Sequence, residues 1–162
     1  MKSSSLLGHS AELLRIIRKS PQPADLLTSS YMRDRKYIGA SDRRAISALV
    51  FHAQRVADSA LYLWAAALDS FIAADHSLDA DLILLLRSLA PDVGCMVAAI
   101  VLAPAWDCSS SLRSLFPSST DLSDRVFVSL AVDFLHDRHS VPPDTAHALC
   151  SSLVDVMNEV LP

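Results

Sequence analysis

Glycine is scarce in this sequence, which has three glycines among its 162 residues, at positions 8, 39 and 94. The loops of Rossmann folds and P-loops need several glycines at close spacing, and neither pattern can be formed from these three. Aromatic residues are also few, at 6%. Because hairpin turns consume glycine, whereas Ala and Leu favour helices, the composition disfavours β-rich and dinucleotide-binding folds and predicts a helical protein.

Cysteines are few and widely spaced, at positions 95, 108 and 150. An odd number at such spacing argues against a disulfide framework and suits a reducing compartment. Cys150 lies beside leucines on an apolar face and is predicted to be buried, whereas Cys108 lies in a loop without a neighbour that would activate its thiol.

Long hydrophobic runs are missing as well. The longest uncharged stretch, Val93–Trp106, contains a proline and is too short for a membrane span. The N-terminus has Lys2 ahead of two leucines and then an early Glu12, which does not resemble a signal peptide. We therefore expect a cytoplasmic protein that does not associate with membranes.

Apolar residues, in contrast, make up 51% of the chain. This is ample for the core of one domain, which we place at residues 1–162. Apolar periodicity and capping residues predict an all-α bundle of seven or eight helices. The predicted helices are Ser4–Arg18, Pro23–Arg33, Ser41–Ala74 with a break near Arg55–Asp58, Leu82–Leu89, Asp92–Ala103, Leu112–Phe116, Asp121–Asp137 and a last helix that follows Pro142–Pro143 and runs to Val160. The continuous apolarity of Leu82–Leu89 predicts burial on all sides.

The formal charge of −4 is the sum of two unlike parts. Residues 1–55 hold ten Lys or Arg against four acids, a net of +6, whereas residues 56–162 hold four Arg against fourteen acids, a net of −10. A chain polarised in this way can carry an anion-binding face despite a pI of about 5.8.

The densest group of cations lies within residues 33–44. It consists of Arg33, Arg35, Lys36, Arg43 and Arg44, accompanied by Tyr31 and Tyr37. Lys and Arg neutralise phosphate, and a tyrosine ring offers a surface on which a base can stack. The preceding helix adds Arg15, Arg18 and Lys19 if it packs beside this group. The alternative is a solvated surface in which Asp34 and Asp42 neutralise neighbouring arginines and Arg43 or Arg44 points inward.

Other polar side chains form no strong pattern. On a helix, Asp133, His136 and His139 are spaced to converge on a metal, but a solvated helix end is the favoured interpretation. The acidic residues within 75–81 are better explained by helix capping than by a cation site. We assign no catalytic residue, no cofactor and no metal.

Residues 23–55 resemble part of a known family. The matching residues are Pro23-Ala24-Asp25 at the start of a helix, Tyr31, Arg33, Arg35 through Gly39, Ser41-Asp42-Arg43-Arg44-Ala45-Ile46, Leu49-Val50 and Arg55. This segment resembles the N-terminal domain of bacterial ribosomal RNA cytosine-5 methyltransferases of the RsmB type, a domain related to the transcription antitermination factor NusB. The resemblance implies a NusB-like helical bundle that binds RNA. The remainder of the chain agrees with that family in helical character and length.

In the longer relatives, an S-adenosylmethionine domain of the Rossmann type follows, and a Pro-Cys motif supplies its catalytic cysteine. This sequence has no glycine-rich cofactor loop, and neither Cys108 nor Cys150 follows a proline. We therefore expect no methyl transfer by this chain alone. The chain is then either the N-terminal part of such a methyltransferase or a free-standing NusB-like protein.

The leading functional hypothesis is binding of structured or single-stranded RNA, with ribosomal RNA favoured by the resemblance, through residues 15–55. One alternative is an antitermination factor that acts through RNA and a ribosomal protein. Another is a protein-interaction module without RNA binding, whose acidic half receives a basic partner. A third is an enzyme fragment whose activity needs a methyltransferase catalytic domain as its partner. Self-association is also open, with Val93–Trp106 as a dimer face, although a buried core helix is the simpler interpretation of that stretch.

Overall fold

The computed structural model describes residues 1–75, 77–106 and 124–160. Over these residues the chain is helical, and no strand is formed. The helices are α1 (Ser3–Lys19), α2 (Ala24–Arg33), α3 (Ala40–Arg55), α4 (Ala57–Ala74), α5 (Ala80–Ser88), α6 (Asp92–Val101), α8 (Asp124–His139) and α9 (Pro143–Val160). The predicted all-α bundle of seven or eight helices is confirmed. The predicted short helix at Leu112–Phe116 lies outside the described residues.

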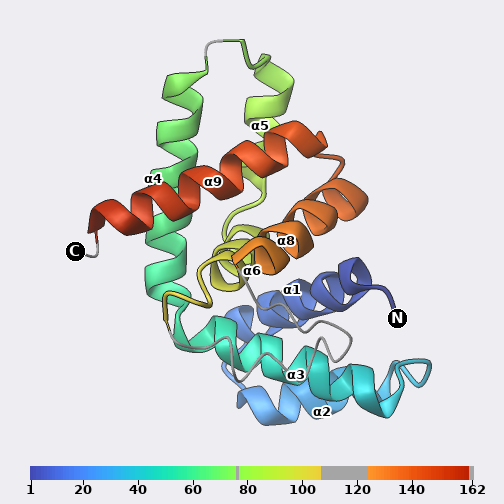
Figure 1. The fold of residues 1–162 in the computed structure, drawn as a ribbon. Coiled ribbons are helices and arrows are strands. Elements are labelled where there is room, and N and C mark those ends of the chain that lie inside the picture. The colour runs from blue at the N-terminus through green and yellow to red at the C-terminus, as the bar shows by residue number, and fades with distance from the viewer. Residues whose placement is uncertain (76, 107–123, 161–162) are drawn as a thin grey trace.

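Helices α1, α2 and α3 form a layer at one end of the molecule (Figure 1). The N-terminal ends of α1 and α3 lie together, since the amino group of Met1 is 3.7 Å from the Asp42 carboxylate. Helix α2 runs antiparallel to both (Figure 1). A small core that includes Leu13, Tyr31, Ile38 and Ile46 holds this layer together. The layer therefore presents two ends, one at the α2–α3 connection and one where α1 and α3 finish.

Helix α6 is the centre of the larger core. Every residue from Gly94 to Val101 is buried, and α1, α3, α4, α8 and α9 all pack against the helix. The interpretation of Val93–Trp106 as a buried core helix is thus confirmed for its central residues. The alternative that this stretch forms a dimer face is wrong for residues 94–103, because their own bundle covers them.

The predicted break in the long third helix is confirmed. Helices α3 and α4 meet at Val56 with a bend of 78°, so α4 leaves the first layer and rises beside α9 (Figure 1). The Val56 carbonyl still accepts the first bond of α4, from the Ala60 amide at 2.8 Å. Within the described residues, no single helix is long and apolar enough to cross a membrane, and only two bent pairs, α3 with α4 and α5 with α6, meet that test jointly.

The prediction that Leu82–Leu89 is buried on all sides is wrong. Leu86 and Leu89 are buried, but Leu84 is 69% exposed, and the other large apolar side chains of α5 are half-buried. Helix α5 projects beside α4 at the end of the molecule opposite α1–α3, so it has a packing partner on one side only (Figure 1). Its N-cap follows the prediction, because the Asp79 carboxylate accepts from the Leu82 amide at 2.7 Å.

Candidate nucleic-acid interface

Exposed cations gather where α2 ends and α3 begins. Arg33 closes α2, Lys36 lies in the connection and Arg44 lies in the first turns of α3, and all three side chains are exposed. Tyr37 stands among them with 70% of its surface exposed. We call Arg33, Lys36, Tyr37 and Arg44 the basic corner. In the part of the chain that the structure describes, none of its three cations makes an ion pair or a side-chain hydrogen bond.

Tyr31 and Arg35, which were predicted to face RNA, are instead held against α1. The Tyr31 hydroxyl donates to Glu12 Oε2 at 2.8 Å and lies 2.7 Å from His9 Nδ1. The Arg35 guanidinium lies 3.6 Å above the centre of the Tyr31 ring and 3.3 Å from Glu12 Oε1. Since the Tyr31 ring is 4% exposed and one face is covered, no base can stack on it. The prediction of base stacking at Tyr31 is therefore corrected.

Arg43 also points inward, as one of the sequence alternatives proposed. Its Nε donates to the Ile38 carbonyl at 2.8 Å, and a terminal nitrogen lies 3.5 Å from the Arg35 carbonyl. These bonds tie the start of α3 to the α2–α3 connection. Asp42 faces the amino group of Met1 rather than a neighbouring arginine. Arg43 therefore fixes the shape of the basic corner without belonging to its surface.

The basic residues of α1 do not extend the basic corner as expected. His9 of α1 lies beside Tyr37, with ring centres 5.9 Å apart, and Arg18 follows nine residues later, about 13 Å further along the helix. Arg18 and Lys19 are exposed, but they lie at the other end of the layer, where α3 ends with Arg55 (Figure 1). The exposed cations at the two ends of the layer thus form two separate groups.

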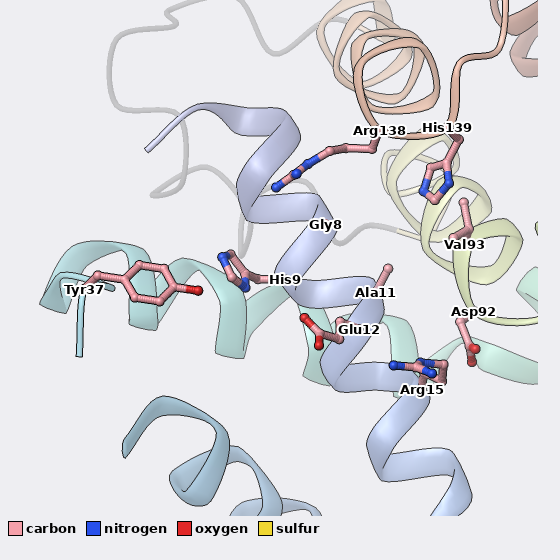
Figure 2. Close-up of a pocket in the computed structure, with 10 residues that line it drawn as sticks. All are labelled: Gly8, His9, Ala11, Glu12, Arg15, Tyr37, Asp92, Val93, Arg138 and His139. Carbon is pink, nitrogen blue, oxygen red and sulfur yellow. The ribbon is translucent and has the colours of Figure 1, made fainter. Parts of the chain in front are cut away.

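A cleft of about 570 Å³ lies across α1, next to the basic corner. Its walls come from α1, the Tyr37 segment, the start of α6 and the end of α8 (Figure 2). The lining residues are Gly8, His9, Ala11, Glu12, Arg15, Tyr37, Asp92, Val93, Arg138 and His139. We call it the α1–α8 cleft. Its volume falls in the range of small-molecule sites, and its lining mixes rings, cations and small apolar side chains.

Two histidines of the α1–α8 cleft have a pKa below the usual histidine value. Burial lowers the pKa of His9; Glu12 opposes this effect, and Arg35 and Arg138 add to it. Burial and the charge of Arg138 lower the pKa of His139, whose ring packs edge-on against Phe134 at 5.2 Å. The Tyr31 hydroxyl donates its one hydrogen bond to Glu12, so it must accept from His9 Nδ1. In the neutral ring this leaves His9 Nε2 as an acceptor.

The residues that sequence analysis weighed as metal ligands do not converge. His136 Nδ1 donates to the Val141 carbonyl at 3.1 Å, while His139 packs on Phe134. Within the described residues, no three His, Cys, Asp or Glu side chains are grouped to hold a metal ion. The described cysteines are buried, and burial raises the pKa of Cys95 to about 11 and that of Cys150 to about 12, so both are inert thiols. Cys108 lies outside the described residues.

Sequence analysis missed most of the α1–α8 cleft. Arg138 and His139 lie more than 120 residues from His9, and no local pattern links them. One indication was available in hindsight: Gly8 lies within a predicted helix, where glycine is costly unless something needs the space. The Arg138 guanidinium fills that space, with Nε 3.1 Å from the position of a Cβ at residue 8.

No protein-family model, curated protein or solved structure matches the chain. The resemblance of residues 23–55 to NusB-like domains therefore stays a prediction.

Proposed function

We propose that this domain is a non-catalytic RNA-binding module that contacts RNA phosphates through the basic corner. The observation that carries the proposal is the exposure of three cations without an ion pair around the exposed Tyr37 ring. Cations that lack an internal partner are free to replace the counterions of a nucleic acid, and a tyrosine ring among them can stack on an unpaired base.

The inward-facing residues support the same function. Arg43 bonds the Ile38 carbonyl, and Arg35 bridges the Tyr31 ring and Glu12, so the connection that displays Lys36 and Tyr37 is held on both sides. A surface that is ordered before binding loses less conformational entropy when RNA binds. Ribosomal RNA is the target that the NusB-like resemblance favours, either as part of a methyltransferase or beside a ribosomal protein in antitermination.

The distribution of charge limits the contact to one end of the molecule. Residues 56–162 carry a net charge of −10 and repel RNA, whereas residues 1–55 carry +6. RNA is therefore expected to lie along the α1–α3 layer, with the second basic group at Arg18, Lys19 and Arg55 as an optional further contact.

The test is fluorescence anisotropy with labelled ribosomal RNA fragments over a series of salt concentrations. Each phosphate contact on single-stranded RNA contributes about −0.7 to the slope of log affinity against log salt. We expect the double variant Arg33→Gln/Arg44→Gln to flatten the slope by about 1.4. The matched control is Arg87→Gln/Arg125→Gln, which removes the same charge from exposed positions elsewhere. Equal slopes for both variants, or no binding by the unmodified protein at 50 mM salt, would contradict the proposal.

A second candidate function, a protein-interaction module, is favoured by one observation. Leu84 projects from α5 with 69% exposure, and the acidic Asp79 and Asp81 begin the same helix. Apolar surface with acidic neighbours suits a protein whose contact face is apolar and basic. Light scattering at several concentrations and pull-down with basic ribosomal proteins test this function, and a Leu84→Gln variant that binds as well as the unmodified protein would argue against it.

A further inference from the structure

The α1–α8 cleft contains a cation whose charge is not neutralised within its walls. The Arg138 guanidinium crosses the backbone of α1 at Gly8, and its Nε, Cζ and a terminal nitrogen lie 3.1–3.4 Å from the position of a Cβ at that residue. Figure 2 shows it above His9, and among the described residues no carboxylate forms an ion pair with it. The nearest acid in sequence, Asp137, accepts from the Ser4 hydroxyl at 2.6 Å. Arg138 is exposed, so its charge is accessible to an anion from outside.

The acidic residues of the cleft do not supply that anion. Both oxygens of Glu12 are engaged, Oε2 by the Tyr31 hydroxyl and Oε1 by Arg35. Asp92 lies at the far end of the cleft, beside Arg15 (Figure 2). The cleft therefore has one end with a cation alone, at Arg138, and another end where Arg15 and Asp92 lie near each other (Figure 2).

The remaining lining fits an aromatic ring. His9 and Tyr37 present neighbouring rings, tilted by 48°, at the edge of the cleft. His9 Nε2 is an acceptor, as derived above from the Tyr31 bond, and Asp92 offers carboxylate oxygens to further donors. A nucleotide has the matching parts, namely a phosphate, a flat base with N–H donors and sugar hydroxyls.

We propose that the α1–α8 cleft binds a single nucleotide, with its phosphate on Arg138 and its base against the rings of His9 and Tyr37. The nucleotide has two conceivable sources, an unpaired residue of the RNA held by the adjacent basic corner or a free nucleotide. The first source rests on the proposed function, and the second does not. In both, Tyr37 contributes its ring to the cleft as well as to the basic corner.

The experiment follows the histidine rings of the full chain by NMR while AMP, UMP or inorganic phosphate is added. We expect the ring signals of His9 and His139 to shift with AMP or UMP, while those of the buried His52 and of His147 on α9 stay in place. Arg138→Gln should weaken nucleotide binding at least about tenfold, the loss of one charged hydrogen-bonding partner. Arg125→Gln, an exposed arginine on the same helix, is the matched control and should change nothing.

A parallel titration with a single-stranded pentanucleotide and a fully paired duplex distinguishes the sources. If Arg138→Gln loses affinity for the pentanucleotide but keeps its affinity for the duplex, the cleft binds an unpaired nucleotide of RNA. If the protein binds AMP and Arg138→Gln keeps its affinity for the pentanucleotide, the cleft binds a free nucleotide. If Arg33→Gln/Arg44→Gln weakens RNA binding, Arg138→Gln does not, and no nucleotide shifts His9 or His139, then the cleft proposal fails while the proposed function stands. Phosphate that binds as tightly as AMP also overturns the nucleotide assignment.

Discussion

The indole nitrogen of Trp64 lies 2.5 Å from the position that a Cβ atom would occupy at Gly94. Trp64 is 1% exposed, and two of its ring carbons lie 2.7 Å from the same position. Helix α4 can approach the central helix α6 this closely only because residue 94 has no side chain. A rigid buried ring cannot retreat as a flexible chain end does.

The first prediction concerns this contact. Gly94→Ala should destabilise the fold by about 1–3 kcal/mol through overpacking, although alanine is the better helix former by about 1 kcal/mol. Gly8→Ala is the matched control, because the three atoms nearest to its new Cβ belong to the flexible end of the Arg138 side chain, at 3.1–3.4 Å. Urea unfolding of both variants measures the difference. Equal effects at the two glycines would show that the Trp64 contact does not determine the outcome.

The second prediction separates two adjacent arginines. Arg43→Gln should lose about 1–2 kcal/mol of stability, because its charged donor to the Ile38 carbonyl is removed. Arg44→Gln should leave stability within about 0.5 kcal/mol, since Arg44 is exposed, and should reduce affinity for RNA. Thermal melts followed by circular dichroism, together with RNA titrations, measure both. A stability loss at Arg44 as large as that at Arg43 would show that both side chains stabilise the fold.

The third prediction tests the one-sided burial of α5. Leu86→Ala should cost about 2–5 kcal/mol, because Leu86 is fully buried. Leu84→Ala, on the same helix, should cost less than about 0.5 kcal/mol, because its side chain is mostly in water. Chemical denaturation of the two variants gives the comparison. Similar losses at both leucines would mean that a partner or second copy covers Leu84 in solution.

The fourth prediction is a loss of stability in mild acid. Burial lowers the pKa of His52; the hydrogen bond to the Ala99 carbonyl opposes this effect, and the charge of Arg55 adds to it. The unfolded chain therefore takes up protons first as the pH falls. Stability is complete above about pH 6.5, the usual histidine pKa, and falls below it by up to about 1.4 kcal/mol per pH unit for each such histidine.

His9 and His139 shift in the same direction as His52 and add to this effect. His52→Gln removes one titrating group and retains a side-chain donor for the Ala99 carbonyl. Denaturation midpoints at pH 7, 6 and 5 should therefore fall less steeply for the variant. A variant with the same slope as the unmodified protein would assign the acid sensitivity to other groups.

Most helices could be predicted from the sequence because apolar periodicity and caps are local properties. The break at Val56 was expected because a helix from residue 41 to 74 would be unusually long for a globular domain. Burial of α5 could not be predicted in this way. A continuous apolar run shows that a helix avoids water, but the number of neighbours around Leu84 is set by the path of the whole chain.

The candidate site could likewise be predicted from the sequence only in part. The sequence located the cations of residues 33–44, but it could not show which of them face inward. Arg35 turns toward Glu12 and the Tyr31 ring, and Glu12 belongs to another helix. Likewise the α1–α8 cleft joins His9 to Arg138 through tertiary packing alone. Residues that lie far apart in the sequence give no periodic pattern.

The hydrogen bond between Ser4 and Asp137 joins residues that lie 133 positions apart. During synthesis at about 5–20 residues per second, the first helix emerges from the ribosome on the order of ten seconds before its partner α8. Helices α1, α2 and α3 have a small core of their own and can associate during that interval. The side of α1 that faces α6 and α8 stays uncovered until then, which makes it the surface that a nascent-chain chaperone would meet.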